Sequence, residues 1–123
     1  MRQLGQLEAV VMARLWAADR PVSVRDVVED LRHDRTIAYT TVMTVLDNLR
    51  RKGMVTRTKH GRAYRYRPTL TREEHAAALM EQVLAGSDDR QATLLHFVEQ
   101  ITPLELEQLR DALNATPDRD ESE

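Results

Sequence analysis

The chain has 123 residues, of which 41% are hydrophobic and 31% charged, so it fits one compact domain or a small domain with an appendage. Its lack of cysteine excludes a disulfide framework, a thiolate zinc site and a cysteine nucleophile. The N-terminal segment mixes charged and apolar residues, and no run of about 18 apolar residues occurs, so we expect a cytoplasmic protein without membrane insertion.

The net charge of −2 conceals opposite charges in the two halves of the chain. Residues 1–70 hold 14 basic and 7 acidic side chains, whereas residues 71–123 hold 4 basic and 13 acidic ones. The segment from Arg50 to Arg67 contains eight basic residues and no acidic one. This segregation favours a head that binds a polyanion and an acidic segment that binds a partner, although ionic faces can also serve only for solvation.

The first predicted element is a helix over about residues 5–18, because apolar residues recur at helical spacing from Leu4 to Leu15. Pro21 ends it, since proline lacks the backbone amide and disfavours helix in the residue before it. Residues 22–24 are too short for an independent strand but can form an edge strand.

The second helix is predicted to begin after Ser23, which forms a capping-box pattern with Asp26 and serves as the N-cap. It should end near His33. A third helix should run from about residue 39 to residue 52, and Gly53 then stands at the position where helices commonly end on glycine.

The third helix has an apolar stripe on one face and short, mostly uncharged side chains with hydrogen-bonding groups on the other, together with Asp47. B-DNA's major groove admits one α-helix, whose side chains contact base edges. Threonine is a mediocre helix former, so its abundance on an exposed face favours a function over simple solvation. The predicted base-reading residues are Thr40, Thr41, Met43, Thr44 and Asn48.

Two alternating segments follow within residues 54–67 and flank a turn at His60 and Gly61, which predicts a β-hairpin. Tyr64 and Tyr66 should lie on one face of this hairpin and basic residues on the other. A cationic hairpin beside the groove would bind phosphates, which orient a protein on DNA without specifying sequence. The predicted phosphate contacts are Arg50, Arg51, Lys52, Lys59, Arg62, Arg65 and Arg67.

Beyond Pro68 the pattern becomes helical and acidic, with helices predicted over about residues 72–85, 89–100 and 103–113. Three apolar stripes within so short a segment need a cover, and a two-fold interface between identical chains supplies one. Packing against the N-terminal domain of the same chain is the alternative. The predicted dimer-interface residues are Leu79, Val83, Leu94, Phe97, Val98, Leu106 and Leu109.

The expected fold is therefore mostly α with a small β-hairpin. It comprises a winged helix-turn-helix DNA-binding domain at residues 1–70, a helical dimerisation domain at residues 71–113, and a disordered acidic tail at residues 114–123.

Five segments resemble the penicillinase-repressor family of the BlaI, MecI and CopY type. The most specific is the Tyr-Thr-Thr-Val stretch within Ala38–Leu49, which Arg51–Gly53 follows. Leu7–Trp16 resembles the family's opening helix, Arg62–Tyr66 its wing, and Leu95–Glu99 its dimerisation segment. The resemblance covers the chain to about Leu113. It implies a homodimer that binds a palindromic operator in double-stranded DNA and represses transcription.

In two branches of that family a membrane metalloprotease that senses β-lactams cleaves the repressor. The cleaved members have Asn-Phe at the scissile bond, and the matching pair in this chain is His96-Phe97, which makes it the candidate proteolytic site. The copper-responsive branch has a cysteine-rich tail. Because this chain has no cysteine, copper sensing through thiolates is excluded.

Two other functions are alternatives to the repressor. A winged helix can serve as a protein–protein interaction module without operator binding, since a fold does not fix a function. An enzyme would need convergent acid, base or nucleophile groups, and the acidic clusters here fall at helix starts or in the tail. No two of the four histidines have helical ligand spacing, so we expect neither a metal site nor a cofactor.

Overall fold

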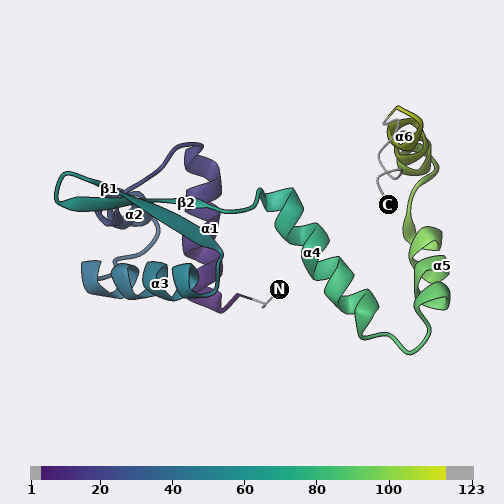
Figure 1. The fold of residues 1–123 in the computed structure, drawn as a ribbon, viewed down its shortest axis with the longest axis horizontal. Helices are drawn as coiled ribbons and strands as arrows, with labels where there is room; N and C mark the ends of the chain where they lie inside the picture. Colours follow the sequence, from purple (N-terminus) through teal and green to yellow (C-terminus); the bar gives the residue numbers. More distant parts are fainter. Residues whose placement is uncertain (1–3, 116–123) are drawn as a thin grey trace. The chain divides into compact units, whose positions relative to one another are not determined.

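The computed structural model describes residues 4–115, and the chain divides into two compact units, Met1–Gln82 and Val83–Glu123. Six helices and two strands follow one another along the chain (Figure 1). Their order is α1 (Gln6–Ala18), α2 (Val24–Leu31), α3 (Tyr39–Arg51), β1 (Val55–His60), β2 (Ala63–Pro68), α4 (Arg72–Ala85), α5 (Arg90–Gln100) and α6 (Pro103–Asn114).

The first unit is a winged helix-turn-helix, in which three helices and a hairpin enclose one hydrophobic core (Figure 1). The apolar stripes predicted for the three helices supply most of this core, and Tyr66 adds an aromatic ring from the hairpin. The prediction of a mostly helical fold with a small hairpin is confirmed. The buried hydrophobic residues are Val11, Met12, Leu15, Val22, Val24, Val27, Leu31, Val42, Val45, Leu46, Leu49, Met54, Val55 and Tyr66.

The predicted capping box opens α2. The Asp26 amide donates to Ser23 Oγ at 3.1 Å, and the Ser23 amide donates to Asp26 Oδ2 at 3.0 Å. The hydrogen bond from the Ser23 amide lowers the pKa of Asp26, because it stabilises the ionised carboxylate. The helix ends at Leu31, slightly before the predicted end near His33.

The two strands form an antiparallel hairpin whose register runs from Val55 opposite Pro68 to His60 opposite Ala63. Gly61 begins the two-residue loop with φ +64°, a conformation that the first position of such loops requires and that glycine adopts without strain. Val22 extends the sheet by one residue on the outer side of β2. Its amide donates to the Tyr66 carbonyl at 3.0 Å, and the Tyr66 amide donates back at 2.7 Å.

Most of α4, from Arg72 to Gln82, belongs to the winged-helix unit. The Trp16 indole Nε1 donates to the Leu70 carbonyl at 2.9 Å, and the ring centroids of Trp16 and His75 are 5.5 Å apart. The Arg72 guanidinium lies 5.3 Å from the Trp16 ring centroid, and His75 is buried. These contacts attach the start of α4 to the first unit, which extends through Gln82. The division of function between residues 1–70 and 71–113 stays a prediction.

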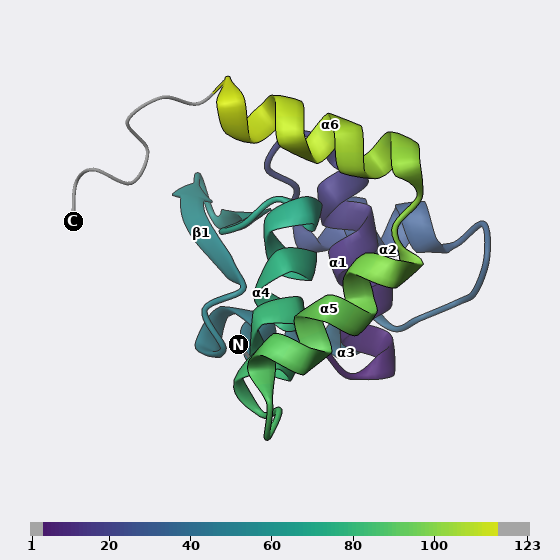
Figure 2. The same cartoon turned by 90° about the vertical axis from the view of Figure 1, so that its right-hand side faces the viewer.

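The second unit contains α5 and α6, which do not pack side by side along their lengths (Figures 1 and 2). Asp89 caps α5, and Thr102 with Pro103 opens α6 as predicted. Because α6 includes Asn114, the expected tail does not begin there, and residues 116–123 lie outside the described part. No helix within residues 4–115 has both the length and the apolar composition that crossing a bilayer requires.

Candidate nucleic-acid interface

Helix α3 presents its polar face to solvent because its apolar face anchors it in the core. Val42, Leu46 and Leu49 have no exposed surface. On the other side Thr40, Thr41, Met43 and Thr44 are exposed, and Asn48 is half-buried. All the predicted base-reading residues therefore lie on one accessible face, while their contact with bases stays a prediction.

A groove of about 730 Å³ lies between this face of α3, the start of α2 and the hairpin. Five of the predicted DNA contacts line this groove, namely Met43, Thr44, Asn48, Arg51 and Arg62. The groove carries four guanidinium groups, so it is strongly cationic. Its lining consists of Ser23, Val24, Arg25, Tyr39, Met43, Thr44, Asp47, Asn48, Arg51, Arg57, Arg62, Ala63, Tyr64 and Tyr66.

The hairpin face that carries the tyrosines is also cationic. The strand register places Arg57 directly opposite Tyr66, and Lys59 directly opposite Tyr64, on the same face. The Arg57 guanidinium lies 3.9 Å from the centroid of the Tyr64 ring. A hydrogen bond with the Tyr66 side chain raises the pKa of Arg57, so this group stays charged. The prediction that one hairpin face is aromatic and the other cationic is therefore wrong, because the tyrosine face also carries Arg57 and Lys59.

Arg65 and Arg67 lie on the other hairpin face, because they alternate with the tyrosines along β2. Arg67 lines a separate hollow that also contains Trp16 and Arg72. The structure therefore does not bring these two predicted phosphate contacts to the groove beside α3.

The basic residues at the end of α3 lie in different surroundings. Arg51 Nη2 lies 2.7 Å from Asp47 Oδ2, and Arg50 Nη2 lies 3.6 Å from Asp47 Oδ1. The Lys52 ammonium instead donates to Glu8 Oε1 of α1 at 2.7 Å, and these two side chains are only 22% and 12% exposed. The Lys52 hydrogen bond holds the pKa of Glu8 below its ordinary value. Lys52 therefore joins α3 to α1.

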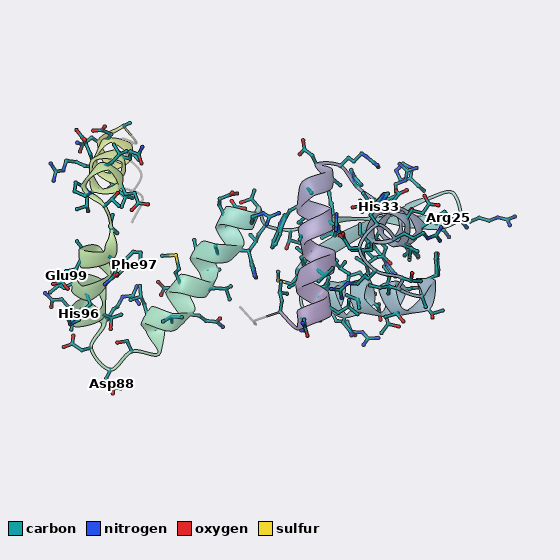
Figure 3. The ribbon with its side chains drawn as sticks, turned by 180° about the vertical axis from the view of Figure 1, so that it is seen from behind. Arg25, His33, Asp88, His96, Phe97 and Glu99 are labelled. Atoms are coloured by element: carbon teal, nitrogen blue, oxygen red, sulfur yellow. The ribbon has the colours of Figure 1, made fainter. Side chains whose placement is uncertain are left out.

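Sequence reasoning missed two cations of the groove, Arg25 and Arg57. The alternation of side chains along β1 could have placed Arg57 on the same face as the tyrosines once the register was known. No local pattern could have placed Arg25, because the fold alone brings the first turn of α2 beside α3. The Arg25 side chain extends outward from α2 into solvent (Figure 3).

The predicted interface residues of the second unit are largely uncovered. Phe97 is 46% exposed and Leu109 is 50% exposed, and Val83, Leu94, Val98 and Leu106 are also exposed, whereas Leu79 of α4 is half-buried. Contact of these side chains with a second chain stays a prediction.

The candidate proteolytic pair lies inside α5. His96 and Glu99 project from one side of this helix and Phe97 from a different side (Figure 3). His96 Nδ1 is 3.4 Å from Glu99 Oε1, and both side chains are largely exposed. In the described range, residues 4–115, no three histidine, cysteine or acidic side chains are grouped to hold a metal ion.

Comparison with known proteins agrees with this geometry. The model of the penicillinase-repressor family matches residues 4–115. The transcriptional regulator BlaI of Mycobacterium tuberculosis is 46% identical over 116 residues, which span 92% of this chain and 84% of that protein. The match extends over both structural units.

Two solved structures have a similar fold. The DNA-binding domain of the repressor BlaI in solution superimposes with a TM-score of 0.52 and 26% identity, covering 58% of this chain and 87% of that one. A MarR family protein from Bacillus stearothermophilus gives a TM-score of 0.50 at 18% identity over 92% of this chain and 72% of that one, a likeness of fold alone. The chain belongs to the penicillinase-repressor family and is a transcriptional repressor of that type.

Proposed function

We propose that two copies of the chain bind a palindromic DNA duplex, with α3 in the major groove and the hairpin against the phosphate backbone. The observation that carries this proposal is the groove between the polar face of α3 and the hairpin, which holds Arg25, Arg51, Arg57 and Arg62. A helix fits the major groove, and guanidinium groups beside it neutralise phosphates. The relative BlaI is named as a transcriptional regulator, which supports the same role.

We assign base contacts to the exposed face of α3 and phosphate contacts to the cations around it. Arg25 and Arg57 join the phosphate set because they line the groove, whereas Lys52 has a structural role because it pairs with Glu8. Arg65 and Arg67 can reach phosphates only if the DNA backbone passes along the other face of the hairpin. The proposed base contacts are Thr40, Thr41, Met43, Thr44 and Asn48, and the remaining phosphate contacts are Arg50, Arg51, Lys59 and Arg62.

The proposed dimer forms through the apolar faces of α5 and α6 together with the C-terminal half of α4. Large exposed apolar patches commonly mark protein–protein interfaces. A two-fold interface uses the same patch on both chains and matches the symmetry of a palindromic operator. The proposed contacts are Leu79, Val83, Leu94, Phe97, Val98, Leu106 and Leu109.

The test begins by selecting a duplex from a random DNA library with the full-length wild-type chain. Binding of this selected duplex and of a shuffled duplex of equal composition is then measured at two salt concentrations. Thr41→Ala should weaken the selected duplex about 5- to 100-fold and leave the shuffled one nearly unchanged. Arg62→Ala should weaken both and reduce the salt slope by about 1.

Equal losses on both duplexes from both substitutions would contradict this assignment. Failure of the wild-type chain to select any duplex would instead favour a winged helix that docks on other proteins. The same titrations, carried out with one and two half-sites, distinguish a bound dimer from a bound monomer.

We further propose that a sensor protease, if one releases the chain from DNA, cleaves between His96 and Phe97. Both residues are exposed in the single chain but lie within α5, and Phe97 belongs to the proposed dimer interface. The dimer contact must therefore open, and the helix unwind locally, before an extended segment can enter a protease. Mass spectrometry of the chain from cells treated with a β-lactam checks this point. Fragments that end elsewhere, or an intact chain during induction, would contradict it.

The proposed role requires binding and not catalysis, and it places the chain in the cytoplasm, where bacterial DNA lies. It needs neither a metal nor a cofactor. Chromatin immunoprecipitation followed by sequencing would identify the target genes.

A further inference from the structure

Asp47 is the single acidic residue among the described side chains that line the groove between α3 and the hairpin. A carboxylate that faces a polyanion repels it, so under the proposed function this side chain opposes the binding of any duplex. The other charged side chains in the described lining are four arginines, so Asp47 is the one negative charge in a cationic groove. Its contacts indicate what it does there.

Both oxygens of Asp47 contact guanidinium groups. Oδ2 lies 2.7 Å from Arg51 Nη2, and Oδ1 lies 3.6 Å from Arg50 Nη2. The charge of Asp47 also raises the pKa of Arg57 on the hairpin, although less than the contacts with the two tyrosines do. The Asp47 side chain is 33% exposed, whereas that of Arg51 is 71% exposed. The carboxylate therefore restrains Arg51 and leaves its outer edge open to a ligand.

We propose that Asp47 is a positioning residue that sets the sequence specificity of this repressor, an inference that rests on the proposed function. The carboxylate holds the Arg51 guanidinium toward the groove, where it can contact a base edge as well as the phosphate backbone. It also repels the backbone of a duplex that offers no matching contact. Asp47 thus weakens binding to all DNA but weakens binding to unrelated DNA more, which is how a repulsive element produces specificity.

A purely structural role is the alternative, because an aspartate four residues before an arginine also stabilises a helix. That role predicts lower thermal stability and equal changes in affinity for every duplex. The ratio of the dissociation constants for unrelated and selected DNA separates the two roles, since helix stability does not change this ratio.

The experiment measures binding of the full-length Asp47→Asn variant to the selected and the shuffled duplex at two salt concentrations. We expect the affinity for the shuffled duplex to rise about 3- to 10-fold, because one repulsive charge per chain is removed. The affinity for the selected duplex should change little or fall, so the specificity ratio should drop about tenfold. An unchanged ratio would overturn the proposal.

Glu29→Gln is the matched control, because Glu29 is exposed on α2 and does not line the groove. The substitution changes the net charge of the chain by the same amount as Asp47→Asn does. It should leave the ratio unchanged, and a drop equal to that of Asp47→Asn would overturn the proposal. The double variant Asp47→Asn with Arg51→Ala tests the route of action. If Asp47 acts partly by positioning Arg51, the loss of specificity ratio in the double variant should be smaller than the sum of the losses in the two single variants, and fully additive losses would overturn the positioning role.

These outcomes are distinguishable from failure of the proposed function. A wild-type chain that selects no duplex contradicts the function itself. A wild-type chain that selects a duplex, combined with an unchanged ratio in Asp47→Asn, overturns only the role of Asp47.

Discussion

The winged-helix unit and the C-terminal unit carry apolar residues at similar helical spacing but differ in where these residues lie. In the first unit Val42, Leu46 and Leu49 of α3 are fully buried among side chains of the same unit. In the second unit Phe97 and Leu109 keep about half of their surface exposed, at 46% and 50%, and none of the described residues from Val83 onward is buried.

This difference shows that an amphipathic pattern specifies a helix but not the partner that covers it. Burial of apolar surface supplies about 25 cal/mol per Å² whether the cover belongs to the same chain or to another. The first unit gains this free energy on folding alone. Under the proposed function the second unit gains it only on association, so its stability depends on protein concentration.

The largest expected effect comes from truncating the core of the first unit. Leu46→Ala should lower the free energy of unfolding by about 2–5 kcal/mol, because it leaves a cavity in a fully buried site. The difference from wild type in chemical denaturation should be the same at every protein concentration. Thr40→Ala on the exposed face of α3 is the control and should change stability by less than about 0.5 kcal/mol. A loss of stability in Leu46→Ala that depends on protein concentration would contradict the view that the first unit is stabilised by its own core.

The matching substitution in the second unit is Phe97→Ala. It should weaken dimerisation by about 2–4 kcal/mol, because aromatic residues dominate interface energies, and this corresponds to about a 30- to 700-fold higher dissociation constant. Sedimentation velocity across a dilution series measures it. Leu95→Ala, on the same helix but outside the proposed interface, should have a smaller effect. A wild-type chain that sediments as a monomer at all concentrations would refute the dimer.

A smaller effect is expected from the ion pair between α1 and the end of α3. Glu8→Gln should lower the stability of the first unit by about 1.5–3 kcal/mol at neutral pH, since it removes a charged hydrogen bond to Lys52. The control is Glu29→Gln, because Glu29 is exposed on α2. Thermal unfolding at several pH values checks both the size and the pH dependence of the loss.

The sign of this pH dependence follows from the lowered pKa of Glu8, whose ordinary value is 4.5. Because the folded state binds the proton less tightly than the unfolded state, the contribution is fully present above about pH 4.5. It disappears as the pH falls through the lower folded value. The difference between wild type and Glu8→Gln should therefore shrink in acid, and a difference that grows there would contradict the assignment.

The smallest effect concerns the attachment of α4 to the rest of the first unit. Trp16→Phe keeps an aromatic ring beside His75 but removes the indole N–H that donates to the Leu70 carbonyl, so we expect a loss of about 0.5–1.5 kcal/mol. Hydrogen exchange should become faster in the first turns of α4. Tyr39→Phe, at an exposed site, should leave it unchanged. Unchanged exchange in Trp16→Phe would show that this hydrogen bond does not hold the start of α4 on the winged-helix core.

The sequence alone determined the helices, the caps that open α2 and α6, and the accessible face of α3. Ser23 with Asp26, and Thr102 with Pro103, act within a few residues of themselves, so their caps could be recognised without the fold. The spacing of Val42, Leu46 and Leu49 likewise determined which side of α3 is buried, because helical periodicity is a local property.

Only the tertiary structure decided which cations share the groove and where the first unit ends. Lys52 pairs with Glu8, 44 residues away, Arg57 stacks on Tyr64 across the hairpin, and Trp16 binds the Leu70 carbonyl 54 residues away. Each of these contacts joins elements that are distant in sequence or depends on strand register. A local sequence pattern cannot predict such contacts, because they form only when the core brings the elements together.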